Sequence, residues 1–217
     1  MQTTLTIGDR SIRFDTFEPR TANPHPAILL LHGAGGNAEF WVGRFTPPIS
    51  RAGVAVYALH YFDRTGTIRA DLPTINDGIH VPLWLSTIRD ALSYIAQRPN
   101  VDASRIGLVG ISLGAFLSLA VATLPDTPPI KAIVEVSGGL VPPFAANATH
   151  YFPPTLILHG DADTIVPVAQ ARALSTLLAQ LDVTHEMQIF RGETHWFTDT
   201  GQMRILTATA KFLGSHL

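Results

Sequence analysis

The sequence predicts an α/β domain built on a mostly parallel central sheet, with an antiparallel N-terminal hairpin and helices on both faces. Two observations support this fold class. Short apolar runs, typical of buried strands, alternate along the chain with longer segments of helical period. Polar or glycine-rich turns follow several of these runs, at the sheet edge where parallel sheets build their sites. With 217 residues, we expect residues 1–217 to form a single domain.

A hairpin is expected over residues 3–18, because apolar and polar residues alternate on both sides of Gly8-Asp9. A buried strand is then expected at residues 27–31, and further strands at 54–59, 106–111, 130–136, 155–159 and 186–190. Helices are expected over 38–52, from Pro82 to the stop at Pro99, from Ser112 towards 124, from Pro167 to 178, and at the C-terminus. Residues 140–153 are too few for a large cap domain.

Composition excludes several classes of function. The net charge is −2 without a basic cluster, so no nucleic-acid partner is expected. The absence of cysteine excludes disulfides, thiolate chemistry and cysteine-bound zinc. The N-terminus does not resemble a signal peptide, and the longest apolar runs are too short to span a bilayer. We therefore expect a cytoplasmic protein without membrane insertion, either monomer or homodimer.

The candidate nucleophile is Ser112, within Gly110-Ile111-Ser112-Leu113-Gly114. An apolar strand precedes it and an apolar helix of small residues follows it, which is the context that a nucleophile elbow requires. The glycines two residues before and after allow strand and helix to pass closely at the bend. The N–H of Leu113, at the start of the helix, can then stabilise a developing oxyanion. A serine that only caps the helix is the alternative.

A second oxyanion donor is expected from His32-Gly33-Ala34-Gly35-Gly36, directly after the strand at 27–31. Flexible N–H groups at this edge can face the same oxygen, and Ala34 is the expected donor, with Gly35 as a further substrate contact. His32 is expected to brace the turn rather than act as a base. A glycine-rich connection without a ligand is the alternative.

The acid and the base are expected to be Asp163 and His195, each in the loop after a strand. A serine hydroxyl needs a base, and the imidazole needs an acid to fix its tautomer and stabilise its charge. The chain order of nucleophile, acid and base is that of the α/β-hydrolases. Asp161 shares the turn with Asp163, and we expect it to bond backbone N–H groups and set that turn. The other histidines do not follow the last strand.

Two further features have open interpretations. Residues 60–81 are expected to form a long irregular loop that lines the site, with Tyr61, Phe62 and Arg64 as substrate contacts, or else a solvated connector. Glu135 lies near the end of an apolar strand, where a carboxylate is costly unless it is paired. It either tunes the site or, more commonly for such residues, has a structural partner.

The whole chain resembles an α/β-hydrolase of the dienelactone hydrolase-like branch, and it is similar also to small carboxylesterases and acyl-thioesterases. The resemblance lies in the motifs around Ser112, Asp163 and His195, in the His32 loop, and in residues 101–107. It implies a Ser-His-Asp hydrolase without a cofactor. Dienelactone hydrolases proper carry cysteine as the nucleophile, whereas this chain has serine, so a general ester or thioester is the expected substrate.

The sequence therefore predicts hydrolysis of small carboxylic esters, thioesters or lactones through an acyl-serine intermediate. Two other classes of function are the alternatives. A hydrolase-fold protein that binds a small molecule without turnover would not need a base beside a strained serine. A metal hydrolase would need ligand spacing of the HExxH kind, which the nine histidines do not show, so no metal is expected.

Overall fold

The computed structural model describes residues 1–19, 24–36 and 38–217. Its described strands form one sheet of eight in the order β1-β2-β4-β3-β5-β6-β7-β8. The strands are β1 (Gln2–Ile7), β2 (Arg10–Phe17), β3 (His25–Leu31), β4 (Ala55–Leu59), β5 (Val101–Ile111), β6 (Ala132–Val136), β7 (Thr155–Gly160) and β8 (His185–Phe190). The helices are α1 (Ala38–Arg51), α2 (Leu72–Asn76), α3 (His80–Ala96), α4 (Leu113–Val121), α5 (Ala169–Gln180) and α6 (Asp199–His216). Two short 3₁₀ helices, η1 (Tyr61–Arg64) and η2 (Phe144–Asn147), complete these elements.

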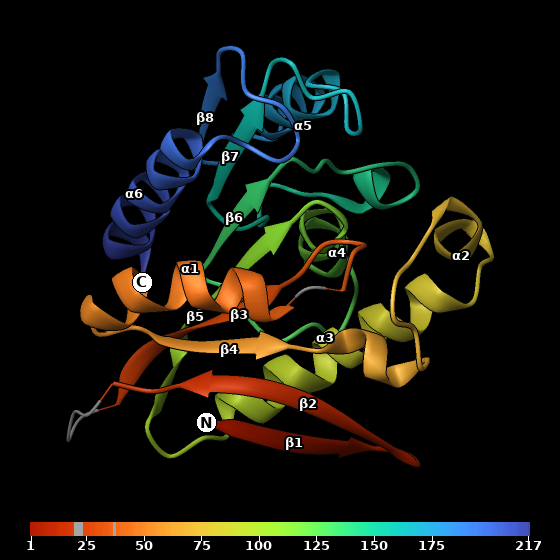
Figure 1. Ribbon diagram of the computed structural model, residues 1–217, viewed down its shortest axis with the longest axis vertical. Coiled ribbons are helices and arrows are strands. Elements are labelled where there is room, and N and C mark those ends of the chain that lie inside the picture. The colour runs from red at the N-terminus through yellow and green to blue at the C-terminus, as the bar shows by residue number, and fades with distance from the viewer. Residues whose placement is uncertain (20–23, 37) are drawn as a thin grey trace.

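The strand directions confirm the predicted fold class. β1 pairs with β2, and β2 with β4, in antiparallel directions, whereas every pair from β4 to β8 is parallel. The hairpin at the N-terminus therefore extends one edge of a parallel sheet, as Figure 1 shows.

Helices cover both faces of the sheet, which is why the central strands are apolar without alternation. On one face, Leu29, Leu108 and Ile133 pack in a core with α3, α4 and α5. On the other, the alternate strand residues Ile28 and Val109 pack in a core with α1 and α6. Figure 1 shows α1 and α6 together on the second face.

The segment 60–81 differs from its prediction as an irregular loop. It holds η1, α2 and the first residues of α3, which begins at His80, two residues before the expected start at Pro82. The Asp71 side chain caps α2 by accepting a hydrogen bond from the Thr74 N–H at 2.9 Å. A side-chain cap of this kind stabilises a helix too short to form on its own.

The register brings the carboxyl ends of the parallel strands to one edge. Leu31 pairs with Gly110, Gly110 with Glu135, and Gly160 with Phe190. The loops after β3, β5, β7 and β8 therefore emerge beside one another, and these loops carry the candidate site residues. Within the described ranges, no helix combines the length and apolar character needed to cross a membrane.

Candidate active site

Ser112 occupies a strained bend between β5 and α4. Its φ of 53° and ψ of −119° are unfavourable for a residue with a Cβ. The bend is held because the Ser112 N–H donates to the Val136 carbonyl at 2.8 Å. A Cβ on Gly110 would lie 2.3 Å from the carbonyl oxygen of Gly114, and one on Gly114 would lie 2.3 Å from that of Leu31. Both glycines are therefore required by the close approach of strand and helix.

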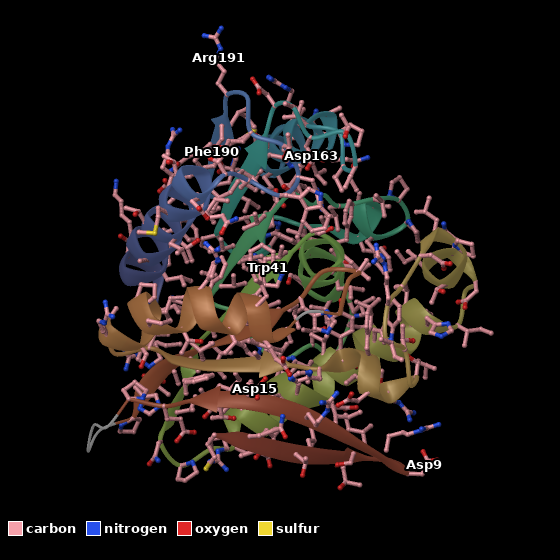
Figure 2. The ribbon with its side chains drawn as sticks, viewed as in Figure 1. Asp9, Asp15, Trp41, Asp163, Phe190 and Arg191 are labelled. Atoms are coloured by element: carbon pink, nitrogen blue, oxygen red, sulfur yellow. The ribbon has the colours of Figure 1, made fainter. Side chains whose placement is uncertain are left out.

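The structure brings Ser112, Asp163 and His195 into contact. The Nε2 atom of His195 lies 3.0 Å from Ser112 Oγ, and its Nδ1 lies 2.7 Å from Asp163 Oδ2. Because Asp163 faces Nδ1, a neutral ring keeps its proton on Nδ1, and Nε2 can accept a hydrogen bond from the Ser112 hydroxyl. Figure 2 labels Asp163 in the loop between β7 and α5.

Asp163 is fixed in its ionised state by several donors. Its Oδ1 accepts the N–H groups of Ile165 and Val166, each at 2.9 Å. Burial alone would raise the pKa of this carboxyl, but the Val166 N–H, the His195 ring and the Ile165 N–H together lower it below its usual range. The carboxylate therefore stays charged opposite the imidazole.

His159 is a supporting residue that the sequence analysis did not assign to the site. Its Nε2 lies 2.9 Å from the Val166 carbonyl oxygen and 3.5 Å from Asp163 Oδ2, and the whole side chain is buried. Burial lowers the pKa of His159, so a neutral ring holds the turn that carries Asp163. In the sequence, the only sign of this role was that His159 and Asp163 lie four residues apart across one turn.

Asp161 and Glu193 shape the loops on which Asp163 and His195 lie. Asp161 Oδ1 accepts the Gly192 N–H at 2.6 Å, so among the described residues its side chain bonds the neighbouring His195 loop, whereas Asp163, not Asp161 as expected, accepts the N–H groups of the turn. Glu193 accepts both the N–H and the hydroxyl of Thr198, at 2.7 and 2.6 Å. These bonds hold the loop on both sides of His195.

His32 braces the loop after β3. Its Nδ1 donates to the Gly33 carbonyl at 2.8 Å, and its ring stacks on Tyr61 with centroids 4.3 Å apart. Burial lowers the pKa of His32 to about 4, so the ring is neutral near pH 7. The Tyr61 hydroxyl donates to the His32 carbonyl at 2.7 Å. The His32 ring therefore bonds within its own turn and packs against the Tyr61 and Phe62 rings of η1, as expected of a bracing residue.

The same loop passes directly beside the serine. A Cβ added to Gly33 would lie 3.3 Å from Ser112 Cβ. Among the described residues, the N–H groups of Ala34 and Leu113 donate to no acceptor, and Gly35 is exposed. Within the described ranges, two N–H groups without an acceptor therefore lie on the segments that adjoin Ser112.

Two of the expected substrate contacts belong to the core instead. Tyr61 is 0% exposed and Phe62 only 4%, and both rings pack against Trp84. The expectation that Tyr61 and Phe62 contact a substrate is therefore corrected: both rings are buried and pack against the His32 ring. Arg64 lies 3.9 Å from Asp9, near the turn of the N-terminal hairpin.

An exposed tryptophan adjoins His195 and was not singled out from the sequence. Trp196 is 68% exposed, and its ring meets the His195 ring edge to face at 5.4 Å between centroids. In the described part of the chain, no three His, Asp or Glu side chains come together as ligands for a metal ion.

The sheet order, the strained serine at the end of β5 and the flanking helices are those of an α/β-hydrolase. A sequence model of the dienelactone hydrolase family matches residues 14–212, and the chain belongs to that family.

This chain is similar in sequence to a thioesterase, and similar in fold to solved structures of the two further proteins given below. Mouse (Mus musculus) acyl-coenzyme A thioesterase 5 is 32% identical over 135 residues, which are 62% of this chain and 29% of that protein. Est1E from Butyrivibrio proteoclasticus superposes with a TM-score of 0.79 at 16% identity over 99% of this chain and 98% of its own. A dienelactone hydrolase-like promiscuous phosphotriesterase, P91, from metagenomic libraries gives a TM-score of 0.79 at 19% identity, over 100% and 97%. At such identities the two structures establish the shared fold.

Proposed function

We propose that the protein is a serine hydrolase that cleaves small carboxylic esters, thioesters or lactones through an acyl-serine intermediate. The observation that carries the proposal is the unbroken hydrogen-bond chain from Ser112 through His195 to Asp163. Nucleophile, base and orienting acid are each within hydrogen-bond distance of the next, which is the geometry that serine catalysis needs.

In the first half of the reaction, His195 Nε2 takes the proton of Ser112 as Oγ attacks the carbonyl carbon. The oxygen of the tetrahedral intermediate lies where the N–H groups of Leu113 and Ala34 can donate to it. Asp163 stabilises the imidazolium, which then gives its proton to the departing alcohol or thiol. The carbonyl re-forms as an acyl group on Ser112.

In the second half, the neutral His195 takes a proton from a water molecule that attacks the acyl carbon. Collapse of the second tetrahedral intermediate releases the acid, and the imidazolium returns the proton to Ser112 Oγ. Apart from the substrate and one water molecule, the proposed reaction uses only groups of this chain in either half.

The relatives support the substrate class. The family is one of hydrolases, the mouse relative is named a thioesterase, and a structure similar to this chain is named esterase PE8. Thioesters and oxygen esters present the same acyl carbon to the serine, so both are proposed as substrates. The mouse relative is much longer than its aligned part, so its own substrate is not carried over to this chain.

The test is a panel of esters, thioesters and lactones with matched acyl groups, assayed with wild type, Ser112→Ala and, as a control, Ser215→Ala on the exposed end of α6. We expect turnover of at least one class, a loss of roughly 10⁴-fold or more in kcat for Ser112→Ala, and wild-type rates for the control. Binding without turnover by the wild type would instead favour a small-molecule binding protein.

A further inference from the structure

Glu135 is a buried carboxyl that the reaction described above does not use. It lies one residue before the end of β6, is 0% exposed, and pairs across the sheet with Gly110 of β5 and Ile157 of β7. A Cβ on Gly138 would lie 2.4 Å from Ala115 Cβ and 3.0 Å from Glu135 Oε2. The carboxyl, the turn after β6 and the first turn of α4 therefore meet at one point.

This carboxyl has a single hydrogen bond. Its Oε2 accepts the Gly138 N–H at 2.8 Å, whereas Oε1 has no partner among the described residues. An ionised carboxylate can accept about four hydrogen bonds, so one donor compensates little of the cost of burying its charge. Burial raises the pKa of Glu135 to about 8, and the Gly138 N–H offsets only part of that effect.

Among the residues that the structure describes, no charged group affects the pKa of Glu135: the causes of its shift are burial and the Gly138 N–H. Its partners across the sheet are Gly110 and Ile157, and its hydrogen-bond donor is Gly138, which itself adjoins Ala115 of α4; none of these residues titrates. From α5, the uncharged Gln170 reaches the adjacent Gly139. On β7 the titratable group is His159, whose Nε2 lies against the Val166 carbonyl oxygen and whose pKa is lowered by burial.

The residues around Glu135 also hold the bend that carries Ser112. The next residue, Val136, accepts the Ser112 N–H at 2.8 Å, and the opposite residue, Gly110, is the first glycine of the elbow. The first turn of α4, which contains Ala115, begins with the N–H of Leu113. A negative charge beside that turn would cancel part of the positive potential at the start of α4. It would therefore raise the energy of a developing oxyanion.

We infer that Glu135 is a positioning residue that supports the Ser112 elbow as a neutral carboxylic acid, and that loss of its proton suppresses hydrolysis at alkaline pH. This inference rests on the proposed function for its effect on turnover. The protonation state of the side chain is independent of that function and can be measured separately.

The first test is the pH profile of kcat/KM from about pH 6 to 9.5 for wild type, Glu135→Gln and Glu186→Gln. Glutamine keeps the shape but cannot ionise, and Glu186 is an exposed glutamate on β8 that serves as the matched control. Above the pKa of Glu135, we expect kcat/KM of wild type and of Glu186→Gln to fall about tenfold per pH unit. Over the same alkaline interval, kcat/KM of Glu135→Gln should change by less than about twofold. The same alkaline loss in Glu135→Gln, or none in wild type, would overturn the inference.

A second measurement needs no variant and no activity. The chain has five glutamates, so ¹³C labelling of their side-chain carboxyl carbons gives five signals to follow with pH. We expect one signal to keep the chemical shift of a protonated acid at pH 6 and to titrate near pH 8. Five signals that all titrate below about pH 5.5 would refute the neutral state. A late signal in a protein inactive on every ester would instead contradict the proposed function, and with it the role in turnover.

Discussion

Replacing Glu135 by glutamine should change the way in which stability depends on pH. Burial raises the pKa of this carboxyl from its ordinary 4.5 to about 8 in the folded protein. Between these values the folded state keeps a proton that the unfolded state has released. The free energy of unfolding therefore falls as pH rises through this interval, and it levels off above about pH 8, where both states are ionised. Glutamine has no such proton and removes this dependence.

The size of the effect follows from the two pKa values. One pKa unit corresponds to about 1.4 kcal/mol. With 4.5 in the unfolded and about 8 in the folded state, wild type should lose roughly 3–4 kcal/mol of stability relative to Glu135→Gln between pH 5 and pH 8. That difference is a large part of the stability of an ordinary domain.

Urea unfolding at pH 5, 6, 7 and 8, followed by tryptophan fluorescence, measures this difference. Wild type and Glu186→Gln should lose stability together, and the curve of Glu135→Gln should separate from theirs as pH rises. Curves for wild type and Glu135→Gln that stay parallel within about 0.5 kcal/mol would show that Glu135 ionises normally in the folded protein, which would refute the reasoning.

Three further predictions concern the site and its support. Asp163→Asn should lower kcat by roughly 10⁴-fold with little change in Tm, whereas Asp161→Asn, which weakens a bond between two loops, should lower Tm and keep most of the turnover. Steady-state kinetics and thermal melts separate the two, and exchanged phenotypes would make Asp161 the acid. Gly110→Ala should destabilise the fold by about 2–4 kcal/mol because its Cβ meets backbone, whereas Gly43→Ala, in open space on a helix, should stabilise by about 0.5–1 kcal/mol. Equal effects in urea unfolding would contradict this contrast. Trp196→Ala should lower kcat/KM about tenfold for esters with bulky apolar leaving groups, because the exposed ring adjoins the base that protonates them. Pre-steady-state kinetics should show deacylation unchanged, and equal losses for methyl and aryl esters would count against a leaving-group contact.

The sheet and its order of elements could be predicted because local signals agree with tertiary structure in this chain. Apolar runs such as residues 27–31 and 155–159 lie within β3 and β7, and the alternation around Gly8-Asp9 forms the expected hairpin. The role of the glycines around Ser112 was also predicted correctly, because a close approach of strand and helix requires residues without a side chain.

Other features depend on contacts that no local pattern encodes. Tyr61 and Phe62 follow a strand in the position of site residues, yet tertiary packing places them in the core beneath His32. The part played by His159 depends on the path of the turn that returns the Val166 carbonyl to its ring. The helix α2, which Asp71 caps, was not predicted because a helix of five residues has almost no periodicity to detect.

The central claim is that Ser112 is the residue to which the acyl group is transferred. Intact-protein mass spectrometry after exposure to a fluorophosphonate probe, followed by peptide mapping, tests it directly. We predict one adduct per chain, located on Ser112, absent from Ser112→Ala and strongly slowed in His195→Ala, because an activated serine needs its base. No adduct, or an adduct on another residue that persists in Ser112→Ala, would contradict the account.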